Sequence, residues 1–173
     1  MSRAFKKESD TEEIDDPIPE PVDVLPAGAK NYITPSGAAR LRDLRDRLVR
    51  EERPRALNKA GAAGDPARQR KLRQIDHQIQ RLDERIAKLE IVDPASQDSG
   101  RVAFGATVAV RDEDGDERTY QICGVDEAVP AEGKISWIST IARALRSRSV
   151  GDEVTLRLPR GEVLLEILEI EYR

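Results

Sequence analysis

One acidic side chain stands alone within a basic stretch of this sequence, and its chemistry could serve two purposes. The stretch AGAAGDPARQRK covers residues 60–71 and holds Asp65 as its single acid. A carboxylate can ligate Mg²⁺, which prefers oxygen donors, or it can cap the first turn of a helix. Pro66 favours the cap, because proline suits the first helical position and aspartate is preferred just before it. The two roles can coexist.

The bases around Asp65 indicate a surface for phosphates. Between positions 53 and 73 there are seven bases and one acid. Such a segment repels a free metal cation and favours phosphates, or the carboxylates around a metal centre. An alternative is a solvated helical face that binds nothing. The candidate phosphate-binding residues are Arg53, Arg55, Lys59, Arg68, Arg70, Lys71 and Arg73.

The net charge of −4 hides three blocks of different sign. Residues 1–29 carry −5, residues 30–90 carry +7 and residues 91–173 carry −6. A basic middle segment between acidic ends is typical of a surface that meets phosphates or another acidic partner. Residues 8–23 hold eight acids, no bases and three prolines. Residues 1–30 are therefore predicted to be a disordered acidic tail, which could aid solubility or shield the basic segment.

Two helices are expected to carry Asp65 at their junction. Thr34 and Pro35 form a helix start signal, and an apolar stripe follows at Leu41, Leu44 and Leu48. The return helix has a heptad seam made of Leu72, Ile75, Ile79, Leu82, Ile86 and Leu89. A fold-back near residue 65 pairs positions whose numbers sum to about 130. The pattern predicts an antiparallel coiled-coil hairpin over 31–91, with a bend rather than a break at Pro54.

The pattern changes after residue 91. Residues 92–100 are predicted to be a linker, and residues 101–173 a compact α+β domain. Alternation of apolar and polar residues predicts strands at 102–110, 118–125, 134–139, 153–159 and 163–173. Residues 140–148 suit one short helix. The expected fold class is α+β, with a helical hairpin followed by a bent antiparallel sheet.

Several function classes are disfavoured by composition. A single cysteine, Cys123, excludes a disulfide within the chain and fits a reducing cytosol. There is no apolar run of the roughly 20 residues needed to span a bilayer, and the first ten residues lack a signal peptide's apolar stretch. No nucleophile triad, P-loop or zinc spacing is present, so independent catalysis is not expected. We expect His77 to be solvated and Cys123 and Trp137 to serve packing. The predicted location is cytoplasmic.

Taken together, the motifs resemble those of a known family. They include Tyr32-Ile33-Thr34, Glu52-Arg53-Pro54, Gly64-Asp65, Leu72-Arg73-Gln74-Ile75-Asp76, Ile91-Val92-Asp93, Phe104-Gly105-Ala106, Asp126-Glu127, Ala142-Arg143-Ala144-Leu145 and Gly151-Asp152. Over residues 31–173 this combination resembles the Gre transcript-cleavage factors of bacteria, with the GreB-like branch fitting best.

The resemblance implies an accessory role at RNA polymerase. It implies an FKBP-like C-terminal domain that docks at the rim of the secondary channel, while the coiled coil enters the channel. Tip acids then help to hold a second Mg²⁺ at the polymerase active site, which hydrolyses backtracked RNA. The factor would need no cofactor of its own, would share Mg²⁺ through Asp65, and would act as a monomer near nascent RNA and DNA. By resemblance, the docking surface includes Ser139, Thr140, Ile141, Ala142, Arg143 and Leu145.

The tip departs from the family pattern. Family members commonly follow Gly-Asp with two residues, Glu-Asn, a further acidic pair and an aromatic residue. Here Pro66-Ala67-Arg68 follows Asp65, and the next shared block arrives about seven residues early. The loss of one heptad keeps the seam in phase but removes the second acid. Three functions stay open: an elongation factor that stimulates cleavage, a channel binder that modulates or inhibits transcription without cleavage, and an FKBP-like isomerase or chaperone.

Overall fold

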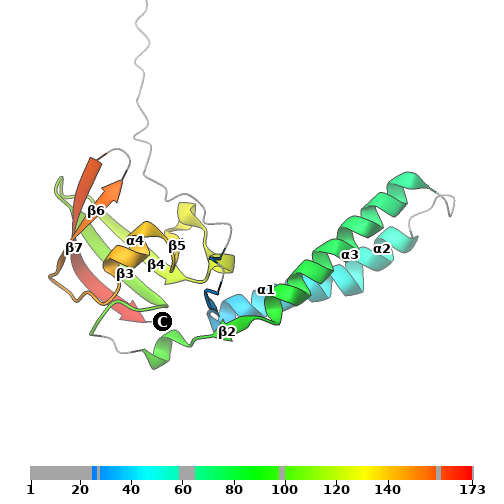
Figure 1. The fold of residues 1–173 in the computed structure, drawn as a ribbon, viewed down its shortest axis with the longest axis horizontal. Helices are drawn as coiled ribbons and strands as arrows, with labels where there is room; N and C mark the ends of the chain where they lie inside the picture. The colour runs from blue at the N-terminus through cyan, green and yellow to red at the C-terminus, as the bar shows by residue number, and fades with distance from the viewer. Residues whose placement is uncertain (1–24, 27, 59–64, 98–99, 159–160, 173) are drawn as a thin grey trace, which may run out of the picture.

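The chain forms a long helical hairpin that projects from a domain built on a curled sheet (Figure 1). The computed structural model describes residues 25–26, 28–58, 65–97, 100–158 and 161–172. The predicted tail up to residue 24, Lys59 and part of the linker lie outside the described residues. Among the helices in the described ranges, none is long and apolar enough to cross a membrane.

The outgoing arm of the hairpin consists of α1 (Pro35–Arg47), a π-helical segment (Leu48–Glu52) and α2 (Arg53–Asn58). The return arm is α3 (Pro66–Ile86). Both arms begin as their sequences predict. The Thr34 hydroxyl accepts a hydrogen bond from the Gly37 amide at 3.0 Å, so it caps α1 just before Pro35. This cap satisfies one of the amide groups that a helix leaves without partners in its first turn.

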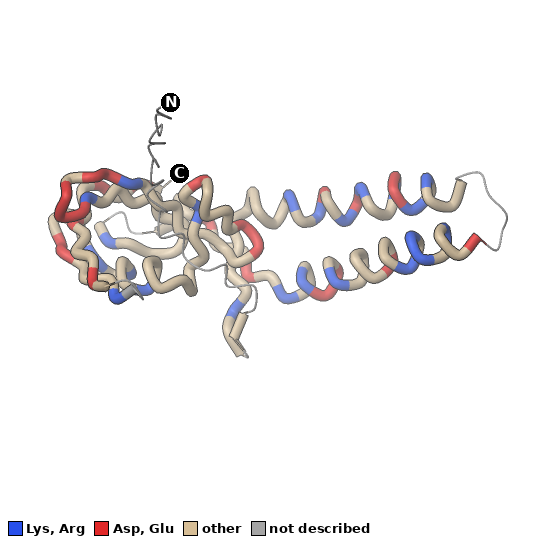
Figure 2. The backbone as a smooth tube through the Cα atoms, turned by 90° about the horizontal axis from the view of Figure 1, so that it is seen from above, with Lys and Arg blue, Asp and Glu red and all other residues tan. Residues whose placement is uncertain are grey.

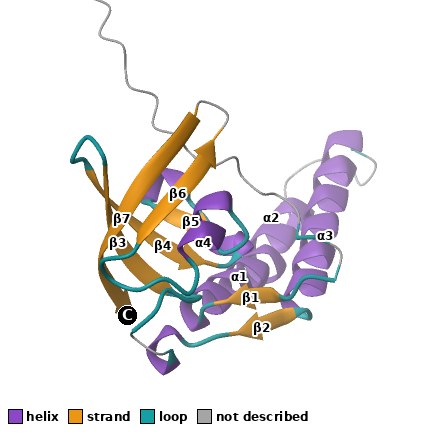
Figure 3. Cartoon of the chain, turned by 60° about the vertical axis from the view of Figure 1, so that its left-hand side comes forward, coloured by secondary structure: helices purple, strands orange, loops and turns teal. Residues whose placement is uncertain are grey.

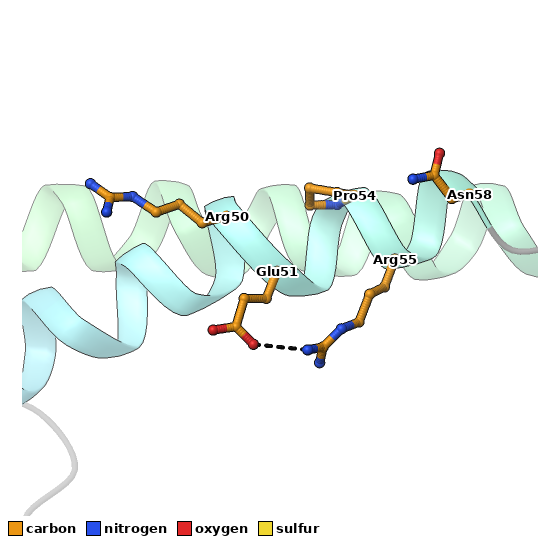
Figure 4. A pocket seen from close by; sticks show the side chains of 5 residues that line it. All are labelled: Arg50, Glu51, Pro54, Arg55 and Asn58. Atoms are coloured by element: carbon orange, nitrogen blue, oxygen red, sulfur yellow. Dashed lines mark hydrogen bonds and ion pairs between the residues drawn. The ribbon is translucent and has the colours of Figure 1, made fainter.

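Pro54 bends the outgoing arm without breaking it. Proline has no amide hydrogen, so a helix that passes through it loses one backbone hydrogen bond. The π-helical segment precedes Pro54, and there the Arg53 amide donates to the Leu48 carbonyl, five residues back. The wider turn absorbs the disruption. Figure 4 shows the shallow hollow beside Pro54, where Arg55 reaches back to Glu51 at 3.0 Å.

Ion pairs and a few buried side chains fix the register of the two arms. Arg45 donates to Asp83 at 3.0 Å, and Arg53 donates to Asp76 at 2.7 Å. Their numbers sum to 128 and 129, close to the predicted 130. Ile75 is 1% exposed, so the seam is dry there. One seam residue was assigned wrongly: α3 ends at Ile86, and Leu89 lies in a strand.

A small parallel sheet closes the base of the hairpin, at the two ends of the range 31–91 that was predicted to be a coiled-coil hairpin. Strand β1 (Asn31–Ile33) pairs with β2 (Leu89–Ile91) in parallel, as Figure 3 shows. Each strand has three residues, too short for a recognisable alternation of apolar and polar side chains. An ion pair also joins the two segments just before β1, where Lys30 binds Glu90 at 3.0 Å.

The C-terminal domain contains a five-stranded mixed sheet in the order β5-β4-β3-β7-β6. Its elements are β3 (Ala106–Asp112), β4 (Glu117–Cys123), β5 (Lys134–Ser136), α4 (Thr140–Leu145), β6 (Glu153–Leu158) and β7 (Gly161–Tyr172). The sheet was predicted to be antiparallel, and that prediction is wrong at one edge, because β5 runs parallel to β4. The connection from β4 to β5 contains two short 3-10 turns, which carry the chain back to the start of the strand.

The domain core lies between the curled sheet and α4. Val108, Ile135 and Ile167 from the sheet and Leu145 from α4 are all at most 1% exposed. Trp137 packs against this core in a partly buried position, in agreement with its predicted packing role. Burial of these side chains is the main favourable contribution to the stability of the domain.

Candidate functional site

The tip aspartate is a helix cap in this structure. Oδ1 of Asp65 accepts a hydrogen bond from the Ala67 amide at 2.9 Å, and Pro66 occupies the first helical position. The second carboxylate oxygen accepts no hydrogen bond from any residue in the described ranges. The predicted cap is therefore confirmed.

The predicted phosphate-binding residues fall into two groups. Arg53 and Arg55 are bound to Asp76 and Glu51, and Arg68 donates to the Leu57 carbonyl. The hydrogen bond to Asp76 also raises the pKa of Arg53, so this charge is already used within the hairpin. A second group, Arg70, Lys71 and Arg73, is exposed. Within the described residues these three side chains make no ion pair.

Most predicted docking residues on α4 are structural in this conformation. Ile141, Ala142 and Leu145 are at most 2% exposed and belong to the domain core. Ser139 is buried as well, and its hydroxyl caps α4 by accepting from the Ala142 amide at 3.1 Å. The remaining two residues, Thr140 and Arg143, are exposed. Of the six predicted docking residues, these two alone present exposed side chains, and the docking role stays a prediction.

A buried carboxylate joins the hairpin to the C-terminal domain. Glu127, with a side chain 4% exposed, follows β4 and reaches the start of α1. Its Oε2 accepts from the amides of Thr34 (2.9 Å) and Gly124 (3.1 Å), and its Oε1 accepts from the Thr34 hydroxyl (2.5 Å). Arg40 of α1 adds an ion pair at 3.3 Å. We call this set the Glu127 clamp.

The neighbouring Asp126 holds the other arm of the hairpin. Its side chain is also 4% exposed, and it pairs with Arg85 near the end of α3. The Asn31 amide group donates to the same carboxylate at 3.3 Å. Adjacent carboxylates thus bind both arms and fix the direction in which the hairpin leaves the domain. Sequence reasoning noticed Asp126-Glu127 only as a shared motif and did not foresee this role.

Aromatic packing completes the junction. The Tyr32 ring, from β1, lies 5.1 Å from the Trp137 ring and 5.7 Å from the Phe104 ring, measured between centroids. The pair with Trp137 is edge-to-face and the pair with Phe104 is tilted, and both are favourable geometries for aromatic rings. The junction therefore combines partly buried aromatic rings with two buried carboxylates.

The other candidate ligands and nucleophiles in the described residues do not come together into a metal site. No group of three or more His, Cys, Asp or Glu side chains in the described part of the chain is arranged to hold a metal ion. His77 is exposed, as predicted. Cys123 is buried, and its thiol contacts the Ile135 carbonyl at 3.5 Å. Its predicted packing role agrees with this position.

The Cys123 thiol is expected to resist thiol reagents in the native protein. Burial, with a smaller contribution from Glu127, raises the pKa of this thiol to about 12. Because the thiolate is the reactive form, labelling by Ellman's reagent at pH 8 should be about a thousandfold slower than in denaturant. Above about pH 9 the unfolded thiol ionises while the native thiol does not, so the free energy of unfolding should fall as the pH rises. Rapid labelling of the native protein would contradict this assignment.

Comparisons with known proteins agree on one family. Residues 97–172 match the family model described as "Transcription elongation factor, GreA/GreB, C-term". The chain is 42% identical over 154 residues to transcription elongation factor GreB of Neisseria meningitidis serogroup B, covering 83% of this chain and 94% of the relative. It is 40% identical to transcription elongation factor GreA of Alkalilimnicola ehrlichii, covering 83% of this chain and 99% of that one.

Among solved structures, an elongation factor GreA/GreB from Nitrosomonas europaea is 23% identical and has a TM-score of 0.40, covering 83% of this chain and 99% of that one. The assignment rests on the sequence relatives, which span both the hairpin and the C-terminal domain. At this identity and coverage, the chain belongs to the GreA/GreB family of transcription elongation factors.

Proposed function

We propose that this chain is a transcription elongation factor that binds RNA polymerase at its secondary channel and acts on paused or backtracked complexes. The observation that carries the proposal is the 42% identity to a GreB factor over 94% of that protein. The shape supports it, because a hairpin held rigidly at its base can enter a channel while the C-terminal domain stays outside (Figure 1). In this proposal the C-terminal domain is FKBP-like and the protein acts as a monomer.

The factor is an accessory protein, and the polymerase active site performs any RNA hydrolysis. Asp65 could contribute one carboxylate oxygen to a Mg²⁺ ion shared with the polymerase. One carboxylate oxygen fits the coordination preference of Mg²⁺, which keeps several of its waters and usually binds only one or two protein carboxylates. The metal would activate a water, while this chain supplies the position of the carboxylate through the capped start of α3.

A second candidate is a channel binder that modulates or inhibits transcription without stimulating cleavage. The specific observation in its favour is the chemistry of the tip. Oδ1 of Asp65 is already engaged by the Ala67 amide, and the nearby bases Arg70, Lys71 and Arg73 carry no acid partner in the described ranges. A positive environment opposes the recruitment of a cation.

A cleavage assay on backtracked elongation complexes separates the two candidates. With Mg²⁺ present, we expect release of 3′ RNA fragments that falls about 10²-fold in Asp65→Ala, comparable to the loss when one preorganised stabilising group is removed from an active site. A matched variant, Asp76→Ala, removes an acid that binds Arg53 within the hairpin and should retain release.

Slower elongation with no fragment release would support the second candidate instead. Failure to bind polymerase at all would contradict both. Because Asp65→Ala also removes a cap worth about 1 kcal/mol, Asp65→Ser serves as a second variant. Serine restores the cap without the charge, so loss of cleavage in both variants assigns the effect to the carboxylate.

A further inference from the structure

The outward face of α3 carries a row of bases along most of its length. At about 100° per residue, positions 70, 73, 77 and 81 lie on one side of a helix, opposite the seam that includes Ile75. The residues there are Arg70, Arg73, His77 and Arg81, and all four are exposed. We call this row the outward stripe. It extends beyond the tip bases that the sequence singled out, and Figure 2 shows basic residues repeated along both arms.

Two of the three acids of α3 do not face this stripe. Asp76 and Asp83 turn toward the other arm, where they bind Arg53 and Arg45. The third acid, Glu84, lies on the stripe's face three residues after Arg81 and accepts from the Gln80 side chain at 3.2 Å. Within the described residues, none of the stripe residues makes an ion pair. In the described part of the chain, the stripe is therefore a helix face with an excess of positive charge.

The N-terminal segment enters the described structure beside this stripe. A groove at the base of α3 is lined on one side by Leu25, Gly28 and Lys30, and on the other by Arg81, Arg85 and Lys88. Leu25, the first described residue, therefore lines the same groove as Arg81, the basal end of the stripe. The chain that precedes Leu25 holds eight acids and no bases in residues 8–23.

The length of this segment is sufficient to cover the stripe. From Arg81 to Arg70 the stripe spans about 16 Å at 1.5 Å per residue. Asp23 lies two residues before Leu25 and Glu8 lies seventeen before it, which is a reach of up to about 60 Å for an extended chain. A short tether gives millimolar effective concentration, so even weak ionic contacts become populated.

We propose that the acidic segment 8–23 binds the outward stripe of α3 and competes there with phosphate-bearing partners. The contact depends on charge, weakens with salt, and leaves the hairpin accessible when a polyanion displaces the segment. It goes beyond the elongation function proposed above and does not depend on it, because it concerns two parts of the same chain.

Paramagnetic relaxation tests the contact in the full chain. A nitroxide on Thr11→Cys, with the buried Cys123 unlabelled, should broaden backbone amide signals of residues 70–81 at low salt. The broadening should vanish at about 1 M salt, where the Debye length is about 3 Å. It should also vanish when all eight acids of the segment are changed to the corresponding amides.

A matched pair of variants shows whether the stripe itself is the partner. The double change Arg73→Gln and Arg81→Gln should weaken the broadening. Arg146→Gln with Arg157→Gln removes the same charge from exposed positions of the C-terminal domain and should leave it intact. Broadening that is equal in both pairs, or that arises between separate chains in a mixed sample, would overturn the proposal.

Competition supplies an independent readout. A fluorescent twelve-nucleotide oligouridylate at low salt should bind the amide-substituted chain about three- to tenfold more tightly than the natural chain, because removal of a tethered competitor raises the apparent affinity. Equal affinities for the two chains would also overturn the proposal.

Discussion

Replacing Glu127 by alanine is expected to lower the free energy of unfolding by about 3–5 kcal/mol, because it removes the acceptor from a buried cluster of donors. The amides of Thr34 and Gly124 and the Thr34 hydroxyl all donate to this carboxylate. Without it they stay buried and unpaired. Arg40 contributes less to the loss, because its side chain is 61% exposed and water replaces the carboxylate.

Chemical denaturation followed by circular dichroism measures this change, which should also lower the melting temperature by about 6–20 °C for a chain of this size. Glu132→Ala is the matched control. Glu132 is exposed and pairs with Lys134 at 2.6 Å, and such surface pairs contribute about 0–1 kcal/mol. Similar losses in the two variants would show that the Glu127 clamp does not hold the junction.

The second large effect is expected at Gly37, in the first turn of α1. A Cβ atom there would lie 2.1 Å from Oε1 and 2.2 Å from Cδ of Glu127. The carboxylate cannot move aside without breaking its hydrogen bonds to Thr34 and Gly124. Gly37→Ala should therefore destabilise the protein by about 2–4 kcal/mol, although alanine is usually the better helix former.

A double-mutant cycle isolates the cause. In the Glu127→Ala background the clash is absent, so Gly37→Ala should become neutral or stabilise by up to about 1 kcal/mol through helix propensity. The expected interaction free energy between the two positions is thus at least about 2 kcal/mol. An equal cost of Gly37→Ala in both backgrounds would assign the effect to some other contact.

Local signals in the sequence were sufficient to predict the two arms of the hairpin and their N-terminal caps. Thr34-Pro35 and Asp65-Pro66 each combine a side-chain acceptor with a proline, and both caps form as predicted. The heptad seam predicted the register of the arms because apolar residues recur at alternating spacings of three and four over about four turns of α3. Such features depend on residues that are close in sequence.

Features that depend on distant residues were not predictable in the same way. Glu127 and Thr34 are 93 residues apart, and an acidic pair after a strand ordinarily indicates an exposed turn. The parallel pairing of β1 with β2 and of β5 with β4 likewise joins segments with no distinguishing local pattern. The burial of Ile141, Ala142 and Leu145 was likewise not foreseen, because a six-residue helix reveals little about which of its faces meets the core.

The parallel β1–β2 ladder has a consequence for how the hairpin can vary. Asn31 pairs with Leu89 and Ile33 with Ile91, so the chain leaves and rejoins the domain at neighbouring points. The arms between these points form a closed module, whose length is independent of its attachment. Adding one heptad to each arm would move the tip outward by about 10 Å while the carboxylates at the junction stay in place. Insertion or deletion of whole heptads can therefore change how far the tip reaches from the C-terminal domain, while the junction itself is unchanged.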